Sequence, residues 1–173
     1  MQQNHFDLLK LPVRYHIDQQ ALEQNYRKLQ AEVHPDRFAT ASPQERLQSM
    51  QISTQVNEAY HTLKNPSARA RYMLLLAGID TLEESNTAMP ADFLMQQMEW
   101  REAADDAKMS GDIDALDKLL NEMRGLIKQL ENTISSNLDD NPDYEMAALT
   151  IRKLSFIEKI STDIEHMIDK LEN

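Results

Sequence analysis

The sequence predicts an all-α protein of two domains, in which an N-terminal helical hairpin with short flanking helices precedes a C-terminal antiparallel three-helix bundle. Three observations predict this fold class. Glycine is rare, with 3 among 173 residues. Apolar residues recur every three or four positions over long stretches, and no segment alternates as a β-strand does. A polar stretch separates the periodic regions, which places the first domain at 1–77, a linker at 78–89 and the bundle at 90–173.

The first domain is predicted to begin with a short apolar helical segment over 6–12, followed by a long helix. Asp18 is a suitable N-cap for that helix. The helix is expected to end by Val33 or His34, because Pro35 removes a backbone donor and keeps the residue before it out of the helical region. Its buried stripe is predicted to be Leu22, Tyr26, Leu29 and Val33.

A second long helix is predicted to follow and to pack antiparallel against the first. Ser42-Pro43-Gln44-Glu45 is a capping box with proline at the first helical position, and Lys64-Asn65-Pro66 closes the helix. The connection between the two helices then contains His34-Pro35-Asp36. A further helix over 66–77 is expected to stop at Gly78. The apolar residues of the second long helix are Leu47, Met50, Ile52, Val56, Ala59, Tyr60 and Leu63.

The second domain is predicted to contain three helices, over 90–110, 113 to about 137 and 142 to about 171. Gly111 ends the first helix, Asp112 caps the second, and the third follows Asn141. Two of the helices carry apolar stripes close to heptad spacing, which favours an antiparallel bundle. These stripes are Ile113, Leu116, Leu120, Met123, Ile127, Leu130 and Ile134, and then Ala147, Thr150, Leu154, Ile157, Ile164, Ile168 and Leu171.

Composition limits the function classes. The chain has no cysteine, so disulfides and thiolate sites are excluded, which fits a reducing compartment. The first residues resemble no export or organelle signal, and no run of about 18 apolar residues occurs. We therefore expect a cytoplasmic protein that does not enter a membrane.

Charge is divided unevenly along the chain. Residues 1–78 carry a net +2 and residues 79–173 a net −13, within a total of −11. The acidic half argues against nucleic acid as a partner, because phosphate binding needs clustered lysine and arginine. The difference between the halves predicts a separate partner for each.

His34 and Asp36 are the first candidate functional residues, since they place a titratable ring and a carboxylate on either side of a stiff proline bend. One alternative is an ordinary loop after a helix that proline terminates. Another is a metal site or a catalytic dyad, but no third ligand or nucleophile accompanies the pair. The other histidines, His5, His16, His61 and His166, show no ligand spacing, so surface or packing roles are expected for them.

The first helix of the bundle carries a second candidate site. On a helical wheel Trp100, Ala104 and Ala107 fall within about 40° of Phe93 and define the core face. Leu94, Met95 and Met98 then point away from the core, with the carboxylates of Glu99, Glu102 and Asp106 around them, and Phe156 lies off the core stripe of the last helix. Methionine is adaptable at binding surfaces. The alternative is that these methionines pack under the first domain or the linker.

Four blocks of the first domain resemble a J-domain, the co-chaperone module that stimulates a DnaK-type ATPase. They are Tyr26-Arg27-Lys28-Leu29, His34-Pro35-Asp36-Arg37-Phe38, Asn57-Glu58-Ala59-Tyr60 with Leu63, and Arg69-Ala70 with Tyr72. A His-Pro-Asp tripeptide alone arises by chance, whereas four blocks in order at this spacing are specific.

The second domain resembles the HscB family, the J-proteins of iron–sulfur cluster assembly. The resemblance rests on residues 93–102, read as FLMQQMEWRE, and on Arg152-Lys153-Leu154 with Phe156. It implies that the bundle binds a scaffold protein of the IscU type and that the J-domain stimulates an ATPase of the HscA type. N-terminal cysteine pairs, a Gly/Phe-rich region and a zinc-binding region are absent from the sequence.

The resemblance gives each site a role. His34, Pro35, Asp36, Arg27, Lys28 and Arg37 are predicted to bind the ATPase, and Leu94, Met95, Met98, Glu99, Glu102, Asp106 and Phe156 the scaffold. We expect no catalytic site, cofactor or metal. The alternatives are a J-protein with another client, a helical adaptor whose corner is only a loop, and an enzyme that uses His34 and Asp36.

Overall fold

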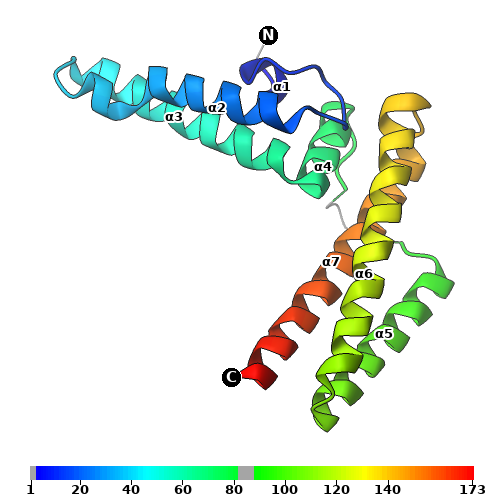
Figure 1. Cartoon of the computed structure of the whole chain (residues 1–173). Helices are drawn as coiled ribbons and strands as arrows, with labels where there is room; N and C mark the ends of the chain where they lie inside the picture. The colour runs from blue at the N-terminus through cyan, green and yellow to red at the C-terminus, as the bar shows by residue number, and fades with distance from the viewer. Residues whose placement is uncertain (1–2, 82–87) are drawn as a thin grey trace. The chain divides into compact units, whose positions relative to one another are not determined.

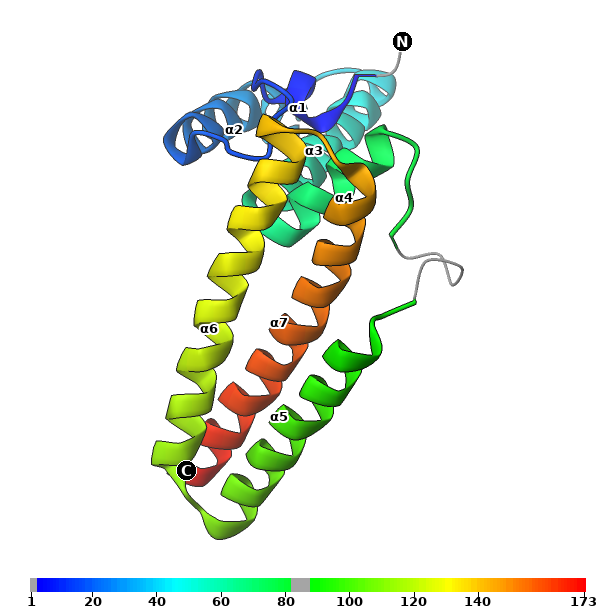
Figure 2. The same cartoon turned by 90° about the vertical axis from the view of Figure 1, so that its right-hand side faces the viewer.

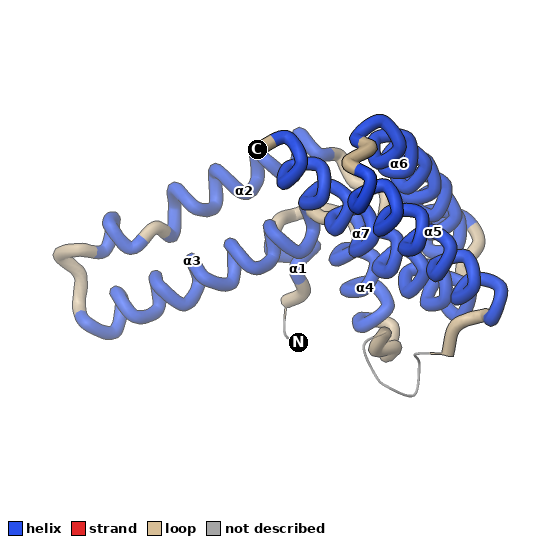
Figure 3. The backbone as a smooth tube through the Cα atoms, turned by 90° about the horizontal axis from the view of Figure 1, so that it is seen from below, coloured by secondary structure: helices blue, strands red, loops and turns tan. Residues whose placement is uncertain are grey.

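The computed structural model describes residues 3–81 and 88–173, and all regular secondary structure in these ranges is helical (Figure 3). The predicted fold class is confirmed. Contacts between residues divide the chain into two compact units, Met1–Met73 and Leu74–Asn173. Residues 82–87 of the predicted linker lie outside the described residues. No helix in the described part is long and apolar enough to span a bilayer.

The first unit is built on an antiparallel pair of helices (Figure 1). Asp18 accepts hydrogen bonds from the amides of Gln20 and Ala21, and Ser42 and Glu45 form the predicted capping box, so both helices begin where the sequence indicates. The helices are α1 (His5–Leu8), α2 (Gln19–Val33), the 3₁₀ turn η1 (Pro35–Phe38), α3 (Pro43–Lys64) and α4 (Pro66–Leu76), which continues across the unit boundary.

The core of the first unit lies where α1 and α2 pack on α3. Leu22, from the predicted stripe of α2, is fully buried, and Tyr26, Leu29 and Val33 are partly buried against the same cluster. The buried residues of the cluster are Phe6, Leu9, Leu11, Ile17, Leu22, Val56, Ala59, Tyr60 and Leu63. Burial of this apolar surface holds the hairpin together.

The second unit contains three long helices that lie side by side (Figure 2). Gly111 has the positive φ of +68° that lets the chain turn sharply from the first helix into the second. The helices are α5 (Ala91–Ser110), α6 (Ile113–Ser135), the π-helical turn η3 (Ser136–Asp140) and α7 (Tyr144–Glu172). One core cluster of buried residues contains Trp100, Ala104, Ala107, Leu116, Leu120, Met123, Ile157, Ile160, Ile164 and Ile168. Other buried apolar residues of this unit are Ile134, Leu138, Ala147, Ala148, Ile151 and Leu154.

Two details of the last helix differ from the prediction. The helix begins at Tyr144, not at Pro142, because the carboxylate of Asp143 caps it by accepting from the Met146 amide at 3.1 Å. Leu171, which was predicted on the core stripe, is exposed because it lies in the last turn of the chain.

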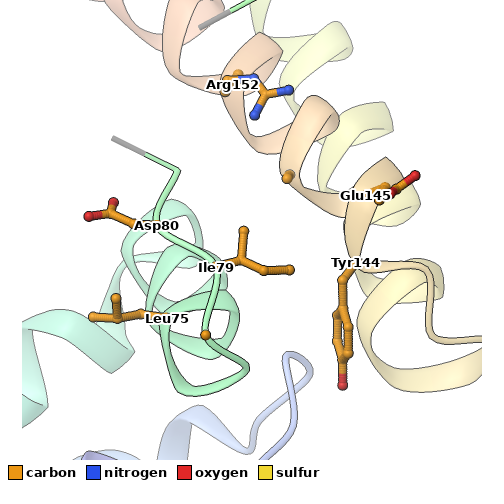
Figure 4. Close-up of a pocket in the computed structure, with 8 residues that line it drawn as sticks. Leu75, Ile79, Asp80, Tyr144, Glu145 and Arg152 are labelled. Atoms are coloured by element: carbon orange, nitrogen blue, oxygen red, sulfur yellow. The ribbon is translucent and has the colours of Figure 1, made fainter. Parts of the chain in front are cut away.

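A pocket in the second unit lies between the residues that end and follow α4 and the first turns of α7 (Figure 4). Leu75 and Ile79 contribute apolar side chains to it, and Asp80, Glu145 and Arg152 contribute charged ones. None of the predicted site residues lines this pocket.

Candidate partner-docking sites

The His34-Pro35-Asp36 corner, called the corner below, closes on itself through a local hydrogen bond. Pro35 opens η1, and the backbone amide of Asp36 donates to Nδ1 of His34 at 3.2 Å. This bond occupies the lone pair of Nδ1, so in the neutral ring the hydrogen is on Nε2. The Asp36 carboxylate lies 3.6 Å from the same Nδ1.

The polar groups of the corner are open to solvent. The Asp36 side chain is 93% exposed and that of His34 is 53% exposed. An exposed carboxylate retains its acceptor positions for a partner, and a bond to a cationic donor is shorter and stronger than one between neutral groups. The corner can therefore present a charged acceptor without moving.

Two side chains fix the corner to the helices behind it. The Arg37 guanidinium donates from Nη1 to the Ala31 carbonyl at 3.1 Å, and the Ser49 hydroxyl donates to the Val33 carbonyl at 2.8 Å. Both acceptors belong to the last turn of α2, where the carbonyls lack partners within the helix. Arg37, predicted to bind the ATPase, therefore has a structural bond within the hairpin. Ser49 was not recognised in the sequence, where a serine in a helix carries no signal of its partner.

A series of polar and aromatic side-chain contacts joins α2 to α3 next to the corner. Tyr26 donates to Asn57 at 2.6 Å and its ring stacks on Tyr60 with 3.9 Å between centroids. Gln30 donates to the same Asn57 oxygen at 2.6 Å and accepts from the Ser53 hydroxyl at 3.1 Å. Side chains that are tied at both ends keep the two helices in one register, which gives the corner a rigid support.

The predicted basic residues of α2 are both exposed. Arg27 lies 3.9 Å from Glu23, one helical turn away, and Lys28 is exposed to solvent. An exposed pair at this distance contributes little and is screened by salt, so Arg27 remains available to an acidic surface.

The outer face of α5 matches the helical-wheel prediction. Met95 is 64% exposed, Met98 is 70% exposed and Leu94 is also exposed, whereas the core side holds Trp100 and Ala104. The predicted acidic residues on this helix are all exposed, and they are Glu99, Glu102 and Asp106. We call the three apolar side chains together with Phe156 the α5 patch.

Phe156 lies on α7, which packs beside α5, and it contacts α5 through Phe93. Its exposed ring makes an edge contact with Phe93, with 6.5 Å between centroids. Phe93 in turn makes an edge contact with Trp100 at 6.2 Å. The aromatic series connects the surface patch to the buried core, which fixes the position of Phe156.

Gln97 was missed by the sequence reasoning. It is buried, and its Nε2 has no hydrogen-bond partner in the part of the chain that the structure describes. The wheel contained the signal, because Gln97 lies about 40° from Phe93 on the core side.

An exposed His-Pro-Asp corner at the tip of a rigid antiparallel hairpin, followed by a three-helix bundle, defines a J-domain co-chaperone, whose partner is a chaperone ATPase of the Hsp70 class. Residues 4–72 match the family described as DnaJ domain, and residues 89–165 match the one described as HSCB C-terminal oligomerisation domain. The chain belongs to the HscB family of co-chaperones and has a role in iron–sulfur cluster assembly, as the sequence predicted.

Relatives and solved structures agree along the whole chain. The chain is 44% identical to a co-chaperone HscB homologue of Azoarcus over 173 residues, covering 100% of this chain and 98% of that protein. It is 47% identical to a homologue of Ralstonia nicotianae over 169 residues, covering 98% and 96%. Chaperone HscB from Vibrio cholerae matches with a TM-score of 0.86 at 36% identity, covering 97% and 99%. The crystal structure of human HscB matches with a TM-score of 0.86 at 29% sequence identity, and the match covers 94% of this chain and 81% of the human chain.

Proposed function

We propose that this co-chaperone stimulates ATP hydrolysis by an HscA-type ATPase through the corner and carries an IscU-type scaffold protein on the α5 patch. The observation that carries the proposal is the exposed Asp36 carboxylate on a corner that is fixed from behind by Arg37 and Ser49. A docking group that is already ordered loses little entropy on binding. The α5 patch supplies a second, separate surface for the client.

The corner acts by binding and transfers no proton in this proposal. The Nδ1 lone pair of His34 is engaged by the Asp36 amide, so this nitrogen is unavailable as a base while the corner keeps its shape. The Asp36 carboxylate accepts a charge-assisted bond from a cationic side chain of the ATPase. The protein then works without a catalytic site, cofactor or metal of its own, and the hydrolysis takes place in the partner.

Arg27 and Lys28 on α2 steer this encounter. Both are exposed, and they are cationic within a half of the chain whose net charge is +2. Such charges accelerate association with an acidic surface and lose this effect as salt screens them.

The α5 patch suits an apolar client surface that has basic residues at its edge. Methionine side chains adapt their shape to a partner, and the apolar contact gains from removal of water. The carboxylates of Glu99, Glu102 and Asp106 favour a client whose apolar surface is bordered by positively charged residues. A client that is held here and an ATPase that is held at the corner are brought together on one chain, which raises their effective concentration.

The test is steady-state ATP hydrolysis by purified HscA with the native protein and with a His34→Gln variant, each with and without IscU. We expect the native protein to accelerate hydrolysis and the variant to lose most of the acceleration, because glutamine does not reproduce the ring that accepts the Asp36 amide. Equal rates with the native protein, the variant and no addition would refute the J-domain role of the corner.

A second candidate for the α5 patch is self-association. The family description of residues 89–165 names an oligomerisation domain, and the patch is apolar and exposed. Sedimentation equilibrium of the native protein alone distinguishes the two functions. A monomer that binds IscU favours the scaffold, whereas a dimer that dissociates when Met95 and Met98 are replaced favours a second copy.

A further inference from the structure

The helix α5 exposes sulfur atoms that an oxidant can reach. The sequence has no cysteine, so the thioethers of its 10 methionines are the only sulfur atoms it carries. Three methionines lie on α5 and all are exposed, with Met95 at 64%, Met98 at 70% and Met109 at 87%. Met123, on α6, is fully buried in the core. An oxidant in solution therefore meets the sulfur atoms of α5, whereas packing shields that of Met123.

Met95 and Met98 differ from Met109 in their surroundings. They are three residues apart, so their side chains are neighbours on one face of α5. Both belong to the α5 patch, whose other members are Leu94 and Phe156. Met109 lies in the last turn of α5, outside the patch. Oxidation of the first two methionines therefore changes the patch, and oxidation of the third does not.

Hydrogen peroxide oxidises a thioether by a two-electron step. The sulfur lone pair attacks one peroxide oxygen, an S–O bond forms and the O–O bond breaks. The second oxygen leaves as hydroxide and takes up a proton to become water. The sulfur is thus oxidised to a sulfoxide while the peroxide is reduced. The product is a polar side chain, and methionine sulfoxide reductases convert it back to methionine.

We propose that Met95 and Met98 form a reversible oxidation site, at which peroxide converts the α5 patch from an apolar to a polar surface and releases the client protein. This inference rests on the proposed scaffold-binding function of the patch. A contact that buries thioethers gains from the removal of water. A sulfoxide oxygen buried in the same contact loses its hydrogen bonds with water, which weakens the complex.

The fold tolerates this change because neither methionine belongs to the core. The opposite side of α5 holds the helix in the bundle through Trp100, Ala104 and Ala107, which are all buried. The bundle therefore keeps its structure when the two exposed sulfur atoms are oxidised. The loss of client binding is local, so that reduction of the sulfoxides restores it.

The test is titration calorimetry of untreated IscU with the full chain before and after exposure to hydrogen peroxide, which is removed before IscU is added. Peptide mass spectrometry gives the sulfoxide fraction at each methionine, and circular dichroism gives the helicity. We expect the affinity to fall about tenfold or more at unchanged helicity. Treatment with the two methionine sulfoxide reductases, one for each epimer, should restore the affinity of the untreated protein.

Two variants separate the α5 patch from the other methionines, and each is compared with its own untreated sample. Met95→Leu, Met98→Leu has no thioether in the patch, so peroxide should leave its affinity for IscU unchanged while Met109 is still oxidised. Met109→Leu retains both sulfur atoms of the patch and should lose affinity on treatment as the native protein does.

The inference is overturned if native protein with sulfoxides at Met95 and Met98 binds IscU as tightly as before, and scaffold binding then stands. It is also overturned if peroxide weakens the Met95→Leu, Met98→Leu variant as much as the native protein. The same holds if Met95 and Met98 stay reduced while Met109 is oxidised. An untreated native protein that does not bind IscU refutes the scaffold-binding function, and the inference with it.

Discussion

Asp36 performs two tasks with two different groups. Its backbone amide donates to the His34 ring and so keeps the corner closed, while its carboxylate extends into solvent. The shape of the corner therefore does not depend on the group that a partner would bind. Since the carboxylate is free of this local task, its whole charge is available for docking.

His5 gives the first unit a pH dependence of its own. The ring stacks on Tyr72 with 4.2 Å between centroids, and the His5 amide donates to the Tyr72 hydroxyl at 2.9 Å. Burial lowers the pKa of His5 below its ordinary value of 6.5, and the Glu58 carboxylate opposes this only in part. The folded state thus favours the neutral ring. The neutral His5 ring contributes fully to the stability of the folded state above pH 6.5. This contribution is lost as the pH falls from 6.5 toward the lower pKa that His5 has in the folded state.

We expect a His5→Phe variant, which stacks but does not titrate, to lose less thermal stability than the native protein when the pH is lowered from above 7 to about 5.5. Melting curves followed by circular dichroism at several pH values provide the measurement. All carboxylates are shared by the two proteins, so the difference between the curves isolates His5. Parallel curves across this range would contradict the assignment.

Some residues were predictable from the sequence and others were not, for a physical reason. Pro35 and the caps Asp18 and Ser42 act on the backbone within a few residues, so local rules found them. Ser49 and Gln97 depend on packing between elements. The hydroxyl of Ser49 bonds a carbonyl 16 positions away, and no local pattern reports that partner.

At the scale of the element, α5 and α3 show when a helical wheel predicts which residues are buried and when it does not. On α5 the apolar and polar residues separate, so the wheel identified both the core side and the exposed Met95 and Met98. On α3 apolar residues occur all round the helix. The burial of Val56 and the exposure of Leu47 are settled only by which side packs on α2. Sequence periodicity therefore predicted the hairpin but not which apolar residues of α3 remain exposed.

The α5 patch leads to a prediction about one helix. Replacing Met95 and Met98 together by alanine should weaken IscU binding roughly 10- to 100-fold, because truncation of a few exposed anchors removes most of the apolar contact. Helicity should be unchanged, since alanine favours helix and neither side chain belongs to the core. Titration calorimetry with IscU gives the affinity, and stimulation of HscA without scaffold should remain at the native level.

Met109→Ala is the control for this measurement. Met109 is 87% exposed near the end of the same helix, so its truncation removes a similar side chain outside the patch. If Met109→Ala and the double variant bind IscU equally well, the patch is not the scaffold surface. If both bind less tightly by the same factor, the effect belongs to methionine in general and the patch has no special role.

At the scale of the whole molecule, the two proposed docking surfaces lie on two separate compact units. The corner lies in the half with a net charge of +2, and the α5 patch lies in the half with −13. Charges of opposite sign favour different partners for the two units and disfavour an exchange of partners. In the function proposed above, the chain acts by holding two proteins near one another and needs no catalytic site of its own.

Coupling on a single chain can be tested by separating the two sites between molecules. We expect an equimolar mixture of two variants to fail to restore IscU-dependent stimulation of HscA. His34→Gln retains the proposed scaffold surface, and Met95→Ala, Met98→Ala retains the proposed ATPase surface. Each variant retains one contact, but the bound partners are no longer joined, so the gain in effective concentration is lost.

The measurement is hydrolysis at protein concentrations well below saturation. There the native protein should exceed the mixture by about tenfold or more, because linkage typically raises avidity at least 100-fold. A mixture that equals the native protein would show that the two sites act independently.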